Sequence, residues 1–566
     1  MVTQRETASK RALKGGLAKE RVRAGVRIPQ IKANSAGRPL GWGVVVSVLV
    51  AGYAHALSMA WPFASIGGLA TGQAWGGLQL ASLALLVWQL QRSMRSGQAA
   101  LLGWLFATAM LCGTFWWLFI SMHLYGGLPA PLAVLAILAL AAALALYYAA
   151  AAGLYVWLAP RSSMGRASAF AALWLLAELA RVKLFTGFPW GEGGYAHIDG
   201  LARSLAGWVG VHGLTWLAAF TAAWLAALLL DARANRWALN QKPVMACLAL
   251  LAIAFGISTL PPAVLATPAD KPARPPLSVT LLQGNIPQDL KFQPGTGVRD
   301  ALEFYGEQLE QVQTSLVVLP ETAFPMLPEQ IPHDIWNAVK TRFASGEQAA
   351  LIGIPLGSSR DGYSNSVLGL KPGAADYRYD KHHLVPFGEF VPPFFHWFID
   401  MMEIPLGDFN RGTLAQAPFE WRGERLAPNI CYEDLFGEEL GANFKDTATA
   451  PTMLVNVSNI AWFGNTVAID QHLNIARMRA LEFARPMLRA TNTGATVVID
   501  AQGRVTHALE RHTRGVLVAE VQGADGLTLY ARWVSSFGLA PWWLLGLAIV
   551  LLAMLACRRR QAQPLA

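Results

Sequence analysis

The sequence predicts a polytopic α-helical membrane protein into which one α/β domain is inserted. The 566-residue chain is 54% hydrophobic and only 14% charged, so lipid rather than water surrounds much of it. Long apolar segments occupy residues 40–261 and return at 535–557. Between them, residues 277–522 alternate short β-branched runs with helical stretches. That alternation is typical of a buried sheet covered by helices.

The apolar segments predict eight transmembrane helices, seven before the α/β domain and one after it. Each is near the ~20 residues that a helix needs to cross the hydrocarbon of a bilayer. The first is longer than the apolar part of a signal peptide and further segments follow it, so we expect the protein to retain it. The segments run over roughly 41–61, 68–91, 99–122, 130–158, 167–184, 208–230, 243–261 and 535–557.

The positions of Lys and Arg predict the orientation of these helices. Residues 1–39 hold ten Lys or Arg against two Glu, and Arg558–Arg560 follow the last segment. Basic flanks of this kind stay in the cytoplasm. Seven crossings then place the α/β domain outside the cytoplasm. The other basic loops, which alternate with loops poorer in Lys and Arg, carry Arg92, Arg95, Arg161, Arg166, Arg233, Arg236 and Lys242.

These patterns divide the chain into parts. Residues 277–522 are long enough to bury a full core, and the prolines before them predict an extended linker. We expect strands at 277–282, 315–320, 349–356, 452–458, 495–500 and 515–521, and helices at 299–313 and 466–483. The remaining parts are a basic cytoplasmic tail (1–39), seven transmembrane helices (40–261), the Pro-rich linker (262–276), a connector (523–534), the eighth transmembrane helix (535–557) and a cytoplasmic tail (558–566).

Composition also excludes several functions. The net charge of +9 is concentrated beside the first apolar segment, where it favours anionic lipid headgroups rather than nucleic acid. Cys112, Cys247 and Cys557 lie in or beside apolar segments, and Cys431 is the single cysteine of the α/β domain. The spacing of the cysteines suggests neither a disulfide framework nor a zinc site. We expect no metal and no organic cofactor.

Three polar residues follow predicted strands, where α/β domains usually keep their sites. Glu321 follows SLVVLP, Cys431 follows RLAPNI, and Lys381 lies in the loop segment 379–390 after a strand near 365–370. Singly, each has a structural explanation: a helix N-terminal charge, a solvated lysine or a small buried side chain. Together they supply the base, the cation and the nucleophile that acyl transfer needs.

Three motifs carry a resemblance to a known superfamily. LPETAFP, YDKHHLVPFGEFVP and NICYED resemble the Glu, Lys and Cys motifs of the nitrilase, or carbon–nitrogen hydrolase, superfamily. The eight apolar segments around such a domain resemble the apolipoprotein N-acyltransferase family, from about residue 40 to 557. Family-typical stretches also occur at 186–200, 456–464 and 471–486. The resemblance implies a four-layer αββα domain.

The resemblance also implies roles for individual residues. Cys431 is expected to be the nucleophile, Glu321 the general base and Lys381 the electrophilic stabiliser of the intermediate. A thiol with an ordinary pKa needs a base within reach. Glu321 serves as that base if burial raises its own pKa toward the working pH. The backbone N–H of Tyr432 is a second candidate to stabilise the oxyanion, beside Lys381.

Other family positions are carried over in the same way. Glu389 is expected to support Lys381, and Glu433 and Tyr432 match positions that matter for activity, although packing at a sheet end explains Tyr432 equally well. Phe292, Trp462 and Phe463 are candidate substrate contacts. The chain departs from the family pattern at Phe292, where Trp is common, and at Ile460, where an acidic residue is common.

The apolar segments contain their own ionisable groups. Glu178 and Arg181 fall three residues apart on one face of the fifth segment, and His212 lies in the sixth. Ionisable groups within a membrane usually face the protein interior. A structural ion pair is one interpretation. Lipid headgroup binding or helix positioning near the site is the other.

The resemblance implies a two-step reaction in a bacterial inner membrane, with the catalytic domain on the periplasmic side. An acyl chain passes from a phospholipid, expected to be phosphatidylethanolamine, to a cysteine thioester. It then passes to the N-terminal amine of diacylglyceryl-cysteine on an apolipoprotein. Two alternatives remain: a membrane-tethered amidase or nitrilase that hydrolyses a small amide, and a transporter or scaffold with an inactive domain.

Overall fold

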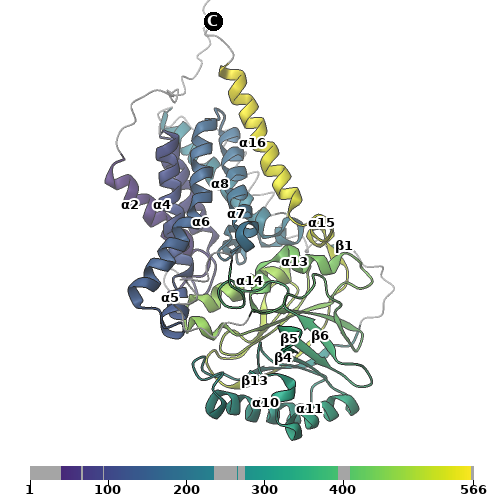
Figure 1. The fold of residues 1–566 in the computed structure, drawn as a ribbon. Coiled ribbons are helices and arrows are strands. Elements are labelled where there is room, and N and C mark those ends of the chain that lie inside the picture. Colours follow the sequence, from purple (N-terminus) through teal and green to yellow (C-terminus); the bar gives the residue numbers. More distant parts are fainter. Residues whose placement is uncertain are drawn as a thin grey trace, which may run out of the picture.

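The computed structural model describes residues 40–64, 68–92, 95–234, 274–392 and 408–561, together with Gly256 and Val264–Leu265. Within them, a bundle of helices forms one end of the molecule and an α/β domain forms the other (Figure 1). The basic tail 1–39, the predicted helix 243–261 except for Gly256, and most of the linker 262–276 lie outside the described residues.

The helices of the bundle match the predicted apolar segments that the structure describes. Four of them, α4, α6, α8 and α16, are long and apolar enough to cross a membrane. Helices α2 and α3 are apolar but have 16 and 15 residues. The helices are α2 (Trp42–Leu57), α3 (Gly76–Leu90), α4 (Ser96–Phe115), α6 (Ala130–Leu158), α7 (Ser163–Lys183), α8 (Ala206–Ala234) and α16 (Ala540–Gln561).

Leucines cover the outer surfaces of α6 and α16, as expected of helices that face lipid. Leu135 and Leu138 on α6 are 58% and 48% exposed, and Leu551 and Leu552 on α16 are 56% and 65% exposed. A soluble protein rarely leaves such continuous apolar surface in water. The helical part therefore has the surface of a membrane protein.

The last predicted helix begins later than expected. Residues 529–537 form a separate helix, α15 (Leu529–Phe537). Gly538, with a φ of +53°, ends this helix before α16 starts at Ala540. Only glycine adopts such a backbone angle without strain. From α15, helix α16 runs along the bundle and ends far from the α/β domain (Figure 1).

The described part of the α/β domain holds two six-stranded sheets. The first has the order β13-β2-β3-β4-β5-β6, and the second has the order β12-β11-β10-β9-β8-β7. The first sheet comprises β13 (Gly515–Val521), β2 (Leu277–Gln283), β3 (Leu316–Val318), β4 (Ala349–Ser358), β5 (Gly362–Leu370) and β6 (Tyr377–Asp380). The second comprises β12 (Val505–Ala508), β11 (Val497–Ile499), β10 (Met487–Thr491), β9 (Met453–Ser458), β8 (Glu424–Ile430) and β7 (Phe419–Trp421).

The two sheets pack face to face, with helices on both outer surfaces. Because successive strand residues point to opposite faces, Val279 and Leu281 of β2 lie in the core between the sheets and Leu282 lies in the core beneath the outer helices. Those outer helices are α10 (Arg299–Gln311) and α11 (His333–Ser345), whereas α14 (Val467–Phe483) faces the bundle (Figure 1). The αββα order implied by the resemblance is confirmed.

Helix α14 attaches the domain to the bundle. The side chain of Gln471 accepts hydrogen bonds from the indole N–H groups of Trp117 and Trp190, at 3.1 and 2.8 Å, and donates one to the carbonyl of Thr114. Asn474, one turn further along, donates to the carbonyl of Met59. These buried bonds fix the side of the domain that holds the second sheet directly on the bundle.

Candidate active site

The three predicted residues come together where the two sheets meet. Glu321 follows β3 and Lys381 follows β6, both of the first sheet, whereas Cys431 follows β8 of the second. The strand expected near 365–370 is β5, and a further strand that was not expected, β6, lies between it and Lys381. That earlier strand, β5, instead supplies Asn365, whose carbonyl accepts a hydrogen bond from the Lys381 backbone N–H.

Cys431 occupies a strained turn between β8 and a short helix (η8, Cys431–Leu435). Its φ is +52°, a left-handed conformation that residues other than glycine seldom adopt. Asn456 and His472 each lie within hydrogen-bonding distance of its carbonyl oxygen, at 3.3 and 3.2 Å. Strain of this kind is characteristic of functional residues that their surroundings hold in place.

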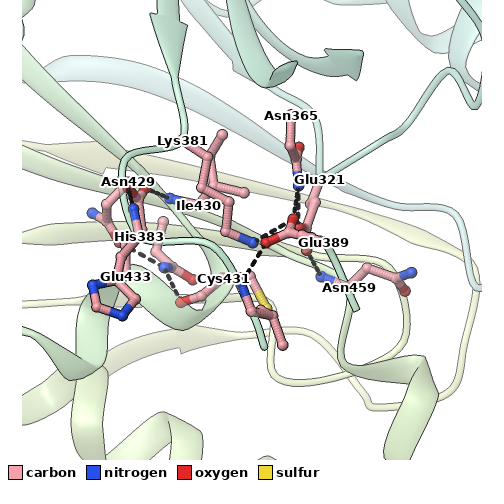
Figure 2. A network of polar contacts seen from close by, with 12 residues as sticks. Glu321, Asn365, Lys381, His383, Glu389, Asn429, Ile430, Cys431, Glu433 and Asn459 are labelled. Carbon is pink, nitrogen blue, oxygen red and sulfur yellow. Dashed lines mark hydrogen bonds and ion pairs between the residues drawn. The ribbon is translucent and has the colours of Figure 1, made fainter. Parts of the chain in front are cut away.

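A buried ion network stands beside the thiol (Figure 2). The Nζ of Lys381, which is 1% exposed, lies 2.9 Å from Oε1 of Glu389 and 3.3 Å from Oε1 of Glu321. Asn365 Nδ2 donates to the same two oxygens, at 2.7 and 2.8 Å. The backbone N–H of Asn459 donates to the other oxygen of Glu321. Two carboxyl groups therefore surround one buried ammonium group.

These contacts set the resting protonation states. Burial disfavours a charged Glu321, but Lys381, Asn365, Lys291 and the Asn459 N–H outweigh it and hold the pKa of Glu321 below its usual range. The raised pKa that was set as a condition for Glu321 to act as the base is therefore not found in the resting site. Burial and the negative charge of Glu321 raise the pKa of Cys431 to about 12, although Lys381 opposes the shift. At rest, an ionised carboxylate stands near a neutral thiol.

Glu433 joins the segment around Lys381 (Tyr379–His383) to the turn at Cys431. Its carboxylate accepts hydrogen bonds from the backbone N–H groups of Ile430, His382 and His383, at 2.6, 2.7 and 3.2 Å, and from the hydroxyl of Tyr379 at 2.8 Å. Four donors from the segments on either side of Cys431 and Lys381 converge on one anion. The contacts of Glu433 are those of a positioning residue.

We expect Glu433→Gln to lower both stability and acyl-enzyme formation. An amide has one acceptor oxygen, so its NH₂ group would face buried donors, at a cost of about 1–3 kcal/mol. The segment around Lys381, which Glu433 holds, would shift when these bonds are lost. Thermal unfolding and single-turnover acylation measure the two effects, with the exposed Glu420→Gln on β7 as the matched control. Equal stability and equal acylation in the two variants would contradict this role.

The remaining predicted positions divide between packing and exposure. Tyr432 is buried against Phe436 and His383, which agrees with the packing explanation. Phe463 packs against Trp117 and Trp190 of the bundle, with its ring centroid 4.2 Å from that of Trp117. The two other candidate substrate contacts are an exposed Phe292 and a half-buried Trp462 in edge contact with Tyr125.

The structure also adds residues that sequence reasoning missed. Asn365, Asn459 and Lys291 all bind Glu321, and His472 binds the turn of Cys431. Lys291 and Asn459 directly precede the two positions where the chain departs from the family pattern. Their place beside these departures was the one sequence signal that could have pointed to them. Ile460, at the second departure, is buried.

Glu178 and Arg181 each brace the loop that follows α7. Arg181 Nη1 donates to the carbonyls of Phe188 and Trp190, and Glu178 accepts from the backbone N–H of Gly193 and the hydroxyl of Thr215. The helix-positioning interpretation therefore describes these contacts better than a direct ion pair.

A second carboxyl group, that of Glu192, lies beside this pair. His212 Nδ1 lies 3.8 Å from Glu178 and 3.7 Å from Glu192, a grouping compact enough to hold a metal ion. Arg181 and a protonated His212 would balance the two carboxylates without one. The charge balance of the cluster therefore does not require a metal.

Comparison with known proteins gives consistent matches along the chain. Residues 56–224 match the family described as apolipoprotein N-acyltransferase N-terminal domain, and residues 278–526 match carbon–nitrogen hydrolase. The apolipoprotein N-acyltransferase of Verminephrobacter eiseniae is 55% identical over 91% of this chain and 97% of its own length.

Two further relatives agree. The apolipoprotein N-acyltransferase of Ralstonia nicotianae is 46% identical over 86% of this chain and 90% of its own length. That of Bordetella bronchiseptica is 40% identical over 94% of this chain and 100% of its own length. Both matches extend through the helical bundle as well as the α/β domain. With its αββα domain docked on apolar helices, the chain belongs to the apolipoprotein N-acyltransferase family.

Proposed function

We propose that the protein transfers an acyl chain from a membrane phospholipid, through a thioester on Cys431, to the N-terminal amine of diacylglyceryl-cysteine on apolipoproteins. The observation that carries this proposal is the placement of a neutral thiol beside an ionised Glu321 and a buried Lys381. That site stands in a domain fixed to apolar helices, which suits two substrates anchored in a membrane.

In the first half-reaction, Cys431 Sγ attacks the ester carbonyl carbon of the phospholipid. The pKa of the thiol is raised and that of Glu321 is lowered, so the proton stays on sulfur at rest and passes to Glu321 only as the sulfur–carbon bond forms. Lys381 and the backbone N–H of Tyr432 stabilise the oxyanion. The ester carbon–oxygen bond then breaks, Glu321 returns the proton to the leaving oxygen, and a lysophospholipid departs.

In the second half-reaction, the neutral amine of the apolipoprotein attacks the thioester. Glu321 takes a proton from the attacking nitrogen and gives it to the sulfur as the carbon–sulfur bond breaks. An amide forms and Cys431 returns to its resting state. A thioester suits this sequence because it divides one difficult transfer into two easier ones.

The alternative is hydrolysis of a small amide by the same residues, and the acceptor distinguishes the two. Purified protein in vesicles would receive labelled phospholipid with and without a diacylated lipopeptide. Transfer predicts triacylated peptide and little free fatty acid, whereas a hydrolase releases fatty acid at the same rate in both. Vesicles of phosphatidylethanolamine and of phosphatidylglycerol, compared side by side, test our further proposal that phosphatidylethanolamine is the donor.

We also propose that the protein resides in the bacterial inner membrane with its α/β domain in the periplasm. Support comes from the basic residues Arg558–Arg560, which lie in the last turn of α16, the helix that leads away from the domain (Figure 1). At residue 270, we expect a reporter that works only in the periplasm to be active. At the C-terminus, we expect a reporter that works only in the cytoplasm to be active. A cytoplasmic signal at residue 270 would reverse the topology and remove access to exported apolipoproteins.

A further inference from the structure

Lys291 is a second buried lysine at this site, and the two half-reactions above do not use it. It lies in the loop between β2 and α10 and is 2% exposed. Its Nζ donates a hydrogen bond of 3.1 Å to the main-chain carbonyl of Glu321. The charge of this ammonium interacts with the carboxyl of Glu321 and with the thiol of Cys431.

The loop that carries Lys291 is tightly held. A side chain at Gly297 would place its Cβ 2.2 Å from the carbonyl oxygen of Leu290, so the loop closes there only around a glycine. Gln288 accepts a hydrogen bond from the side chain of Asn459, whose backbone N–H binds Glu321. Lys291 is therefore fixed in place relative to the base.

The two lysines differ in how their charges are compensated. Lys381 lies between two carboxylates, those of Glu321 and Glu389. The hydrogen bond of Lys291 ends on an uncharged carbonyl. A buried charge whose hydrogen bond ends on a neutral group is costly even with the carboxylate of Glu321 nearby, and that cost falls when further negative charge appears beside it. Negative charge appears beside it when the thiol of Cys431 gives up its proton.

We propose that Lys291 supplies the positive charge that stabilises the negative charge developing on Cys431 and on the substrate carbonyl during acylation. This inference rests on the proposed function and deepens it. The thiol proton still passes to Glu321 and then to the leaving oxygen, and Lys291 keeps its own proton throughout. With Lys291 charged, two lysines balance Glu321 and Glu389. When Lys291 has lost its proton, Lys381 alone faces Glu321 and Glu389. The excess negative charge then opposes the development of negative charge on Cys431.

The charge of Lys291 makes acylation depend on pH. Burial lowers the pKa of Lys291 to about 8, although Glu321 and Cys431 oppose the shift. A lysine is charged below its pKa and neutral above it, so acylation falls as pH rises through about 8. Burial acts in the same direction on Lys381, but Glu389 and Glu321 outweigh it and raise the pKa of Lys381, which stays charged in this range.

The test is the single-turnover release of lysophospholipid by the full-length protein in vesicles, from about pH 6.5 to about 9.5. We expect Lys291→Met to acylate about 100-fold more slowly at neutral pH, the low end of the loss seen when one oxyanion donor is removed. Lys291→Arg keeps a charge that does not titrate, so it should recover most of the rate and lose the decline above pH 8. The exposed Lys340→Met is the matched control.

Several results would overturn the inference. They are a wild-type rate that does not fall near pH 8, a Lys291→Met variant with the wild-type rate, or a Lys291→Arg variant with an unchanged decline. Lower thermal stability in both variants with an unchanged pH profile would show that Lys291 only braces its loop. A wild-type protein that releases no lysophospholipid would instead refute the proposed function itself.

Discussion

Cys431→Ala should abolish both the acyl-enzyme and the triacylated product. The side chain provides the only thiol at the site among the described residues, since Cys112 and Cys557 lie in α4 and α16. Without a nucleophile, neither half-reaction has a covalent route. The measurement is label retained on the protein after exposure to radiolabelled phospholipid, followed by transfer to a diacylated lipopeptide.

Two companion variants make the result specific. Cys112→Ala removes a thiol from the bundle and should acylate normally. Cys431→Ser keeps the shape of the site, but a hydroxyl is far harder to deprotonate, so little acyl-enzyme should accumulate. Substantial transfer by Cys431→Ala would show that the nucleophile is assigned wrongly.

Lys381→Arg should nearly eliminate acylation while preserving the charge. The Nζ fits between two carboxylate oxygens, 2.9 and 3.3 Å away, in a space with 1% exposure. A planar guanidinium needs more room, which costs about 1–3 kcal/mol by overpacking and moves the charge away from the oxyanion. The measurement is single-turnover acylation, with thermal unfolding to separate lost activity from lost fold.

The matched control is Lys340→Arg, at an exposed lysine that pairs with Asp376. It should leave both the rate and the stability unchanged. A stable Lys381→Arg variant with near-normal acylation would mean that Lys381 does not contact the reacting carbonyl.

Sequence patterns predicted most of the α/β domain because its strands are short apolar runs. The six strands expected from those runs correspond to β2, β3, β4, β9, β11 and β13. Strand β10 was missed because Arg489 interrupts its apolar pattern. Its guanidinium is buried but binds Asp434 at 3.0 Å and Asn456 at 2.7 Å. These partners from distant segments compensate the buried charge of Arg489, which the residues next to it in the sequence do not explain.

The site was predicted less completely than the fold. Glu321, Lys381 and Cys431 were found because each lies in a motif just after a strand. Asn365 lies within β5, and nothing in its neighbours marks it. It reaches the site because β5 pairs with β6, which places the Asn365 carbonyl opposite the Lys381 N–H.

The direction of the pKa shift of Glu321 could not be predicted for a related reason. The burial of a residue can be predicted from its apolar neighbours in the sequence. The cations and hydrogen-bond donors that surround a carboxylate cannot, because they come from distant segments. Here Lys291, Lys381 and Asn459 meet on Glu321 from three separate loops. Their combined effect exceeds that of burial and reverses the direction of the pKa shift.

The most direct test of the account is mass spectrometry of the intact protein after incubation with phospholipid. The account predicts one added acyl chain on the peptide that contains Cys431, removable by hydroxylamine and lost when a diacylated lipopeptide is supplied. An acyl chain on another residue, or none under conditions that yield triacylated product, would contradict a thioester on Cys431 as the intermediate.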